Sequence, residues 1–200
     1  MGSAGEDERL FKSLQVGPYT LSNRLVMAPL TRFRADDNHV QLPFVKEYYT
    51  QRSAVPGTLI ITEATFISPR ASGYPNVPGI WSKEQISAWK EVVESVHKAG
   101  GVIFLQLWAL GRTANPQVKE KEGTGDVVSS SDIPENSDKV APRAMSEEEI
   151  WQFVDDYATA AKNAVEGAGF DGVGKLFHSL LITKYLADMY YQRFMGPTGT

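Results

Sequence analysis

The chain has 200 residues, of which 42% are hydrophobic and 22% are charged, a composition typical of a globular protein with a packed core. Its net charge of −4 comes from 20 basic and 24 acidic residues spread along the sequence, which excludes the basic surface expected of a protein that binds nucleic acid or an anionic membrane. The absence of cysteine excludes disulfides, thiolate metal ligands and a cysteine nucleophile, and no metal site is expected.

The N-terminus indicates where the protein resides. Residues 1–8 are acidic and polar, whereas a secretory signal begins with basic residues and continues with apolar ones. No apolar run reaches the roughly 18 residues that a membrane-spanning helix requires. We therefore expect a cytoplasmic protein without a membrane partner, in which residues 1–9 form a flexible N-terminus.

A small β-hairpin and a strand open the predicted fold. Residues 14–21 surround the turn-forming pair Gly17-Pro18, which indicates the hairpin. Residues 24–30 then form a short apolar run that ends with Pro29 and Leu30. Because this run is too continuous to leave one face in water, we interpret it as a buried strand.

Helices alternate with strands in the next segment. Residues 44–54 favour a helix, and residues 57–67 are rich in β-branched residues and predict a second buried strand. Ser82 and Gln85 have the spacing of a capping box, so an amphipathic helix is expected to begin there and to end before the next pair of glycines.

The alternation continues to residue 173. Residues 102–108 form a third apolar run, and Ser146 with Glu149 forms a second capping box in front of an amphipathic helix. Residues 170–173 begin a fourth strand. Strands that alternate with helices imply parallel βαβ units. Residues 113–144 contain no periodic pattern, and we expect a long loop that covers a site or is disordered.

Three ionisable residues stand outside any catalytic pattern. His39 and His97 have no companion at catalytic or metal-ligand spacing, and we interpret both as exposed residues of a loop or helix. Glu63 lies in a predicted buried strand, where a paired structural carboxylate is favoured over a general base.

A series of short motifs follows one another in a fixed order. They are Met27-Ala28-Pro29-Leu30-Thr31-Arg32, Glu47-Tyr48-Tyr49, Pro56-Gly57-Thr58, Ile61-Thr62-Glu63-Ala64, Ile67-Ser68-Pro69, Pro78-Gly79-Ile80-Trp81-Ser82, Gln106-Leu107-Trp108, Gly111-Arg112 and Gly169-Phe170-Asp171-Gly172-Val173. In order and content this series resembles the Old Yellow Enzyme family, the NADH:flavin oxidoreductases and ene-reductases. The resemblance covers most of residues 10–173 and is strongest to fungal members, including reductases of ergot alkaloid pathways.

The resemblance carries expectations about fold and chemistry. It implies an α/β fold in which residues 10–173 form half of a TIM (β/α)8 barrel, preceded by the N-terminal hairpin. It implies FMN as the cofactor, NADPH or NADH as the reductant, and a small enone or enal as the substrate. The family's reaction is hydride transfer from flavin N5 to the β-carbon of an electron-poor alkene, which here would belong to fungal secondary metabolism.

Five positions are matched to cofactor binding by the resemblance. Backbone at Pro29 and Leu30 would lie under the flavin near N5, and the Thr31 hydroxyl would donate to the C4 carbonyl. Ala64 stands where the family brings backbone close to the pyrimidine ring. The Gln106 amide can donate and accept at once, which suits a ring edge that carries both C=O and N–H.

Thr31 and Trp108 are the residues expected to act closest to the chemistry. Trp108 stands two residues beyond Gln106 and would point to the same side and bound the substrate pocket. All these positions end a strand or begin its loop, which is where barrel enzymes place their sites. Without the resemblance, Thr31 is typical of a turn, Gln106 of a strand end and Trp108 of a core.

The sequence departs from the family pattern after Val173. The family continues with a His and an Asn or second His that hold the substrate carbonyl, followed by a Tyr that supplies a proton. His178 lies near this place but out of register, and Tyr185 is too distant, so both are weak catalytic candidates. Residues 174–200 are expected to be a divergent tail, with an amphipathic helix over 180–195.

Two explanations of this departure stay open. Gly174-Lys175 is what a retained intron beginning GGTAAG would encode, or the chain is a shortened protein whose tail covers the half-barrel. In both cases the second half of the barrel would be missing, activity would be impaired, and a homodimer could cover the open edges. The alternative function is a flavin-free half-barrel that acts as a binding module, isomerase or cyclase.

Overall fold

A parallel sheet forms the centre of the protein. The computed structural model describes residues 7–177 and contains a four-stranded sheet in the order β3-β4-β5-β8, in which all neighbours are parallel. Its strands are β3 (Val26–Met27), β4 (Leu59–Phe66), β5 (Val102–Ala109) and β8 (Gly172–Phe177). The predicted α/β class and the parallel connections are confirmed.

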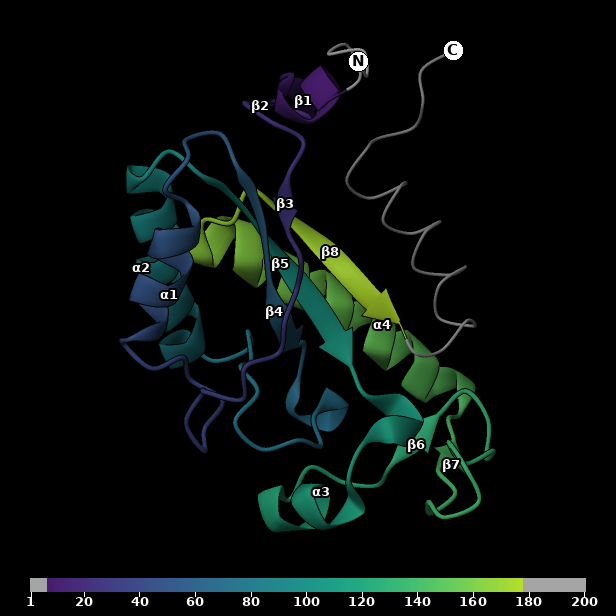
Figure 1. Ribbon diagram of the computed structural model, residues 1–200. Helices are drawn as coiled ribbons and strands as arrows, with labels where there is room; N and C mark the ends of the chain where they lie inside the picture. The colour runs from purple at the N-terminus through teal and green to yellow at the C-terminus, as the bar shows by residue number, and fades with distance from the viewer. Residues whose placement is uncertain (1–6, 178–200) are drawn as a thin grey trace, which may run out of the picture.

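Three helices cover one face of this sheet (Figure 1). They are α1 (Val45–Arg52), α2 (Lys83–Lys98) and α4 (Glu147–Lys162), and α4 continues into the π-helical turn η4 (Asn163–Ala168). The main core lies between these helices and the sheet, where Leu105 of β5 packs in one cluster with Trp89 of α2 and Val154 of α4. Full burial of a large apolar side chain contributes about 1.5–3 kcal/mol relative to exposure, so this layer dominates the stability.

The two long helices begin at their predicted caps. The Ser82 hydroxyl accepts from the Gln85 backbone N–H at 3.2 Å, and the Gln85 side chain accepts from the Ser82 N–H at 3.0 Å. Ser146 and Glu149 repeat this arrangement at the start of α4, at 3.2 and 2.8 Å. Both predicted capping boxes are confirmed.

The hairpin and β8 also agree with the sequence. β1 (Leu14–Val16) pairs antiparallel with β2 (Tyr19–Leu21) and follows the 3-10 turn η1 (Asp7–Phe11). The hairpin lies at the amino-terminal end of the central sheet (Figure 1), where the Ser22 N–H donates to the Gly57 carbonyl at 3.0 Å.

No helix among residues 7–177 has the length and apolar character to span a membrane.

The strand predicted over residues 24–30 is shorter and more exposed than expected. Only Val26 and Met27 pair with β4, and the Val26 side chain is 45% exposed. Within the described residues β3 has a neighbour on one side only, so its other side is not covered. The prediction of a strand buried on both faces is therefore wrong for this segment.

Residues 113–144 contain more secondary structure than their sequence predicts. They hold α3 (Pro116–Glu122), which is capped by Asn115, and β6 (Val128–Ser129), which pairs with β7 (Arg143–Ala144). Elements of two to seven residues are too short to produce a periodic pattern, which explains why a long loop was expected. These elements follow the carboxyl end of β5 and, with the short turns η2 (Pro69–Ala71) and η3 (Gly111–Thr113), border that end of the sheet (Figure 1).

Candidate functional site

The candidate site lies on the face of the sheet opposite α1, α2 and α4, which we call the inner face. Ala64 of β4 is paired with Gln106 of β5, and Phe66 is paired with Trp108 two residues further on. Side chains alternate between the two faces along a strand, and Ile103, Leu105 and Leu107 pack toward the helices. Gln106 and Trp108 therefore point to the inner face. The structure thus places both residues on one side of β5, near its carboxyl end.

An aromatic cluster adjoins these residues. The Trp108 ring stacks on Phe66 with centroids 5.5 Å apart and meets the edge of Tyr74 at 5.9 Å. Trp108 is only 7% exposed, because it belongs to a small apolar cluster with Ala64, Phe66 and Leu110. Its observed surroundings therefore fit a packing residue at the border of the inner face, and its expected contact with substrate stays a prediction.

Pro29, Leu30 and Thr31 form the segment that leaves β3. Leu30 is exposed and Thr31 is half-buried. The backbone N–H of the next residue, Arg32, donates to the Glu63 carboxylate at 3.0 Å. Since Glu63 directly precedes Ala64, this bond holds the Thr31 segment beside β4.

A β-bulge in β4 joins the same residues to β5. The pairing shifts between Ile61 and Ala64, so that Thr62 and Glu63 form the irregular step. There the Thr62 hydroxyl accepts from the Gln106 backbone N–H at 3.2 Å. Bulges redirect side chains near functional sites, and this one directs Glu63 toward α1 while Ala64 keeps its partner Gln106.

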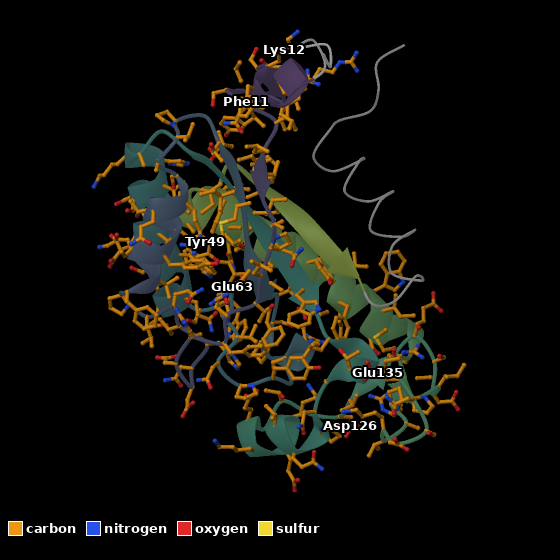
Figure 2. All side chains as sticks on the ribbon, viewed as in Figure 1. Phe11, Lys12, Tyr49, Glu63, Asp126 and Glu135 are labelled. Atoms are coloured by element: carbon orange, nitrogen blue, oxygen red, sulfur yellow. The ribbon has the colours of Figure 1, made fainter. Side chains whose placement is uncertain are left out.

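Glu63 is fully buried between β4 and α1. One carboxylate oxygen accepts from the Gln41 amide at 2.8 Å and from the Tyr49 hydroxyl at 3.4 Å, and the other accepts from Arg32 N–H. The Tyr49 oxygen in turn accepts from the Glu63 N–H at 3.0 Å, and Figure 2 shows both side chains in the interior. The predicted paired carboxylate is confirmed, although it lies in the helix-side layer and not within a barrel.

Burial changes the acidity of this pair. It raises the pKa of the Glu63 carboxyl above its ordinary value of 4.5, and the hydrogen bonds from Gln41, Arg32 and Tyr49 act in the opposite direction. Burial and the Glu63 charge together raise the pKa of the Tyr49 phenol well above its ordinary value. Tyr49 therefore stays protonated and donates to the carboxylate.

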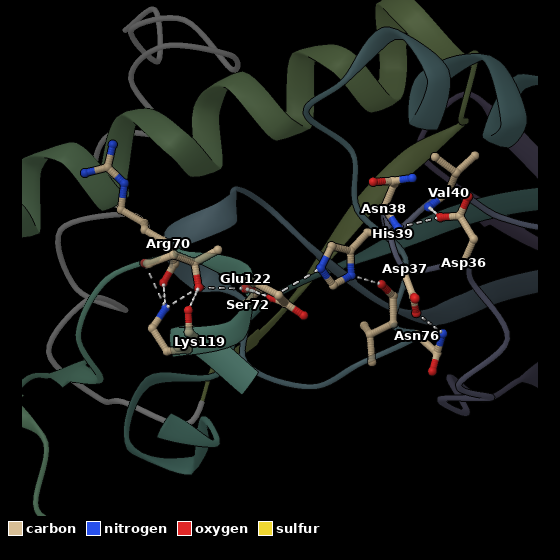
Figure 3. Close-up of polar contacts among 12 residues, drawn as sticks. Asp36, Asp37, Asn38, His39, Val40, Arg70, Ser72, Asn76, Lys119 and Glu122 are labelled. Atoms are coloured by element: carbon tan, nitrogen blue, oxygen red, sulfur yellow. Dashed lines mark hydrogen bonds and ion pairs between the residues drawn. The ribbon is translucent and has the colours of Figure 1, made fainter. Parts of the chain in front are cut away.

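His39 is buried, so its expected exposure is wrong. Its Nδ1–H donates to the Val77 carbonyl at 2.6 Å, and its Nε2 lies 3.5 Å from the Glu122 carboxylate (Figure 3). Glu122 also accepts from the Ser72 hydroxyl at 3.0 Å. Glu122 belongs to α3, which the sequence pattern did not predict, so no local signal could pair it with a histidine 83 positions earlier.

Lys119 anchors α3 to two neighbouring segments. Its buried Nζ donates to the Arg70 carbonyl at 3.0 Å and to the Thr124 carbonyl at 3.2 Å (Figure 3). Desolvation lowers the pKa of this ammonium group. Together with His39 and Glu122, these bonds join the loops that follow β3, β4 and β5, which is a structural role.

The remaining histidine prediction holds in part. His97 lies in the last turn of α2 and its side chain is 40% exposed, as expected for a helix surface. Its Nε2 nevertheless has a partner, the Asp171 carboxylate at 2.9 Å, which also accepts from the Ile103 N–H at 2.8 Å. His178, Tyr185 and the helix predicted over 180–195 lie outside the described residues.

Two polar groups, one in the segment beside β4 and one on the inner face, have no partner within residues 7–177. The Thr31 hydroxyl and the Gln106 side-chain amide form no hydrogen bond there. The same part of the chain contains no cluster of His, Asp and Glu that could hold a metal ion. The chemistry available at this face is therefore hydrogen bonding by a hydroxyl and an amide beside an aromatic surface.

Comparison with known families decides where this chain belongs. The family model of the NADH:flavin oxidoreductase / NADH oxidase family matches residues 9–194. The chain is a member of this family. The match also includes residues 174–194, most of the segment that the sequence analysis treated as a divergent tail.

Two curated relatives of this chain are fungal proteins. The chain is 60% identical over 165 residues to an NADP-dependent oxidoreductase of Aspergillus flavus, covering 82% of this chain and 43% of that protein. It is 58% identical over 184 residues to a chanoclavine-I aldehyde reductase of Penicillium roqueforti, covering 92% of this chain and 48% of that protein. The chain thus spans about half the length of the curated relatives it matches.

A solved structure supports the same assignment. The chain is similar to the Old Yellow Enzyme of Pichia sp. AKU4542, with a TM-score of 0.80 and 41% sequence identity. This similarity covers 84% of the chain and 45% of that structure. The resemblance to Old Yellow Enzymes is therefore confirmed, and the sheet and helices of this chain have a TIM-barrel-like α/β arrangement.

Among the residues that sequence reasoning missed, Gln41 and Tyr49 matter most for the site. Both bind the Glu63 carboxylate, which holds the Thr31 segment. Tyr49 belongs to a matched motif, Glu47-Tyr48-Tyr49, so the resemblance contained a signal for it. Gln41 had none, because its contact with Glu63 joins segments that are distant in the sequence.

Proposed function

We propose that this chain supplies the part of an FMN site that holds the pyrimidine edge of the flavin, in an NAD(P)H-dependent ene-reductase. The observation that carries the proposal is the convergence of the Thr31 segment, Ala64 and Gln106 at the carboxyl ends of three neighbouring strands. Barrel enzymes bind their ligands at this end of the strands. We infer accordingly that the sheet is an arc of a (β/α)8 barrel whose lumen is the inner face.

The residues present fit the edge of a flavin. An isoalloxazine edge carries carbonyls and an N–H, which need donors and an acceptor. The Thr31 hydroxyl and the Gln106 amide can supply these groups, and neither has another partner within residues 7–177. Ala64 is small, so its backbone can approach a planar ring closely. The catalytic candidates His178 and Tyr185 lie outside the described residues.

The chain's own residues suggest how such a site works. Bound FMN would supply hydride to the β-carbon of an enone or enal, after reduction by NADPH or NADH. The Thr31 hydroxyl would donate to the carbonyl that gains charge on reduction, which stabilises the reduced state. The Gln106 amide would fix the orientation of the ring edge, and the Phe66–Trp108 pair would exclude water from one side.

The names of two relatives support this choice of chemistry. The Penicillium roqueforti protein is a chanoclavine-I aldehyde reductase and the Aspergillus flavus protein is an NADP-dependent oxidoreductase. For this chain we infer an α,β-unsaturated carbonyl substrate in fungal secondary metabolism. A homodimer that covers the open edges of the half-barrel also stays a prediction, which sedimentation of the purified chain tests.

A flavin titration tests the proposal. FMN is added to the purified chain while flavin absorbance and tryptophan fluorescence are recorded, and saturable one-to-one binding is expected. Gln106→Leu removes the edge contact and should weaken binding about tenfold, the effect of one lost hydrogen bond to a buried polar group. Gln51→Leu is the matched control, since Gln51 is exposed on α1 and its side chain forms a hydrogen bond only with Glu47 among the described residues.

The outcomes separate the two functional classes. Binding that Gln106→Leu weakens and Gln51→Leu does not supports the proposed flavin site. A folded chain that binds no FMN contradicts it and favours the flavin-free alternative, a binding module, isomerase or cyclase. Binding that is equally strong in Gln106→Leu would show that FMN occupies a different place.

A further inference from the structure

The loop between β3 and α1 is held at two points by one side chain. The Arg32 N–H donates to Glu63 Oε2 at 3.0 Å, and further along the loop the Gln41 amide donates to Glu63 Oε1 at 2.8 Å. Ala35 and Gln41 form an antiparallel bridge between these two points. The carboxylate therefore fixes two points of the loop relative to β4.

The start of this loop needs such an anchor. Phe33, directly after Arg32, has a φ of +52°, a left-handed conformation that costs energy in a residue other than glycine. Its side chain is exposed, so burial of the phenyl ring does not hold the conformation. The backbone is held on either side, by Glu63 at Arg32 and by the Asn76 carbonyl, which accepts from the Ala35 N–H at 3.1 Å.

A carboxylate suits this task better than an apolar or amide side chain. Its donors approach from two sides, Arg32 N–H at one oxygen and Gln41 with Tyr49 at the other. A carboxylate has two acceptor oxygens and an amide has only one. Burial of a carboxylate is costly unless its oxygens are hydrogen-bonded, so filling space would not by itself favour Glu63 here.

We propose that Glu63 is a positioning residue for Thr31. Through the Arg32 N–H it sets the place of the Thr31 hydroxyl beside Ala64 and Gln106, without contacting the ligand itself. This inference rests on the proposed flavin site, in which Thr31 donates to the ring. Glu63 thus acts on flavin binding from the helix side of the sheet.

Three variants separate positioning from general stability. Glu63→Met keeps a similar volume but has no oxygen to accept from Arg32. Glu63→Gln keeps one acceptor oxygen for Arg32. The Gln41 Oε1 atom has no partner within the described residues, and the Gln41 amide can turn so that this oxygen accepts from the new amide group. Tyr49→Phe is the control, because it removes both hydrogen bonds between Tyr49 and Glu63 and leaves the Arg32 bond intact.

Amide hydrogen exchange of the flavin-free 200-residue chain gives the first readout. Peptides that include residues 31–34 should lose protection in Glu63→Met, keep most of it in Glu63→Gln, and keep it in Tyr49→Phe. Unchanged protection in Glu63→Met would overturn the inference, as would a loss that is equally large in β5. If Glu63→Met does not fold, Glu63→Ala replaces it, since water can enter the smaller side chain's cavity and satisfy Gln41 and Tyr49.

Flavin affinity gives the second readout. Glu63→Met should weaken FMN binding about tenfold, and adding Thr31→Ala should weaken it little further, because the two changes remove one interaction. Fully additive losses would contradict the inference. A wild-type chain that binds no FMN would contradict the proposed function, while the exchange experiment would still decide whether Glu63 holds the Thr31 segment.

Discussion

At the scale of single residues, a buried carboxylate and a buried ammonium group of this protein fulfil different tasks. Glu63 is 0% exposed and bonded by three neutral donors, and Lys119 is buried with backbone carbonyls and a threonine hydroxyl around its Nζ. Each is surrounded by hydrogen-bonding groups that compensate in part for lost hydration. Each also joins segments that are far apart in the sequence, Glu63 beside the candidate site and Lys119 on α3.

The raised pKa of Glu63 predicts a pH dependence of stability. Burial raises the folded-state pKa above the ordinary value of 4.5, so the folded protein binds this proton more tightly than the unfolded chain. The contribution of Glu63 to the free energy of unfolding should therefore fall as the pH rises from 4.5 through the folded pKa, and become constant above it.

Glu63→Gln isolates this effect, because the amide does not ionise. Urea unfolding of both proteins over this pH range should show a difference curve in which the wild type loses stability with rising pH relative to the variant. A flat difference curve would mean that burial does not raise the Glu63 pKa.

At the scale of elements, local signals decide where the long helices begin. The capping boxes at Ser82 and Ser146 satisfy backbone N–H groups that the first helical turn leaves unpaired. At α4 the Glu149 carboxylate also accepts hydrogen bonds from Arg143 of β7. These bonds, together with those from Ser146, lower the pKa of the Glu149 carboxyl to about 2. The cap therefore joins the helix to the segment before it.

Removal of this cap should destabilise the protein measurably. Ser146→Ala leaves the Glu149 N–H without its acceptor and should lower the free energy of unfolding by about 1 kcal/mol, as measured by urea denaturation. Ser137→Ala is the matched control, because the Ser137 hydroxyl is exposed and bonds only to the neighbouring Asp138 among the described residues. Equal effects of the two changes would show that the cap contributes nothing specific.

At the scale of the whole molecule, the two ends of the sheet are held by different histidines. His39 joins the loops at the carboxyl ends of the strands through Val77 and Glu122, and His97 joins α2 to the start of β5 through Asp171. The first of these ends carries the candidate site. Order there depends on contacts between loops, since α3 is too short to be stable alone.

Loss of the His39 contacts should loosen α3 selectively. In His39→Leu the Glu122 carboxylate loses a neighbour and the Val77 carbonyl loses its donor, so trypsin should cleave after the exposed Lys121 several-fold faster than in the wild type. His97→Leu, at the other end of the sheet, should leave this rate unchanged. Faster cleavage in both variants would indicate general destabilisation and contradict a local role.

Much of the architecture and part of the site could be predicted without the structure. Two capping boxes, the apolar runs and the Gly-Pro turn are local signals, and they predicted α2, α4, β4, β5 and the hairpin. The ordered motifs predicted the family and selected Thr31, Ala64 and Gln106 through resemblance. Their actual part in flavin binding is still a prediction.

Only the tertiary structure decided the remaining features, because each depends on contacts between distant segments. The exposure of β3 follows from its position at the sheet edge and not from its apolar sequence. The burial of His39 follows from contacts with Phe66 and Trp81 and with Glu122, which is 83 positions away. The anchoring of the Thr31 segment follows from a β-bulge that turns Glu63 toward Gln41 and Tyr49, a geometry that side-chain order alone does not specify.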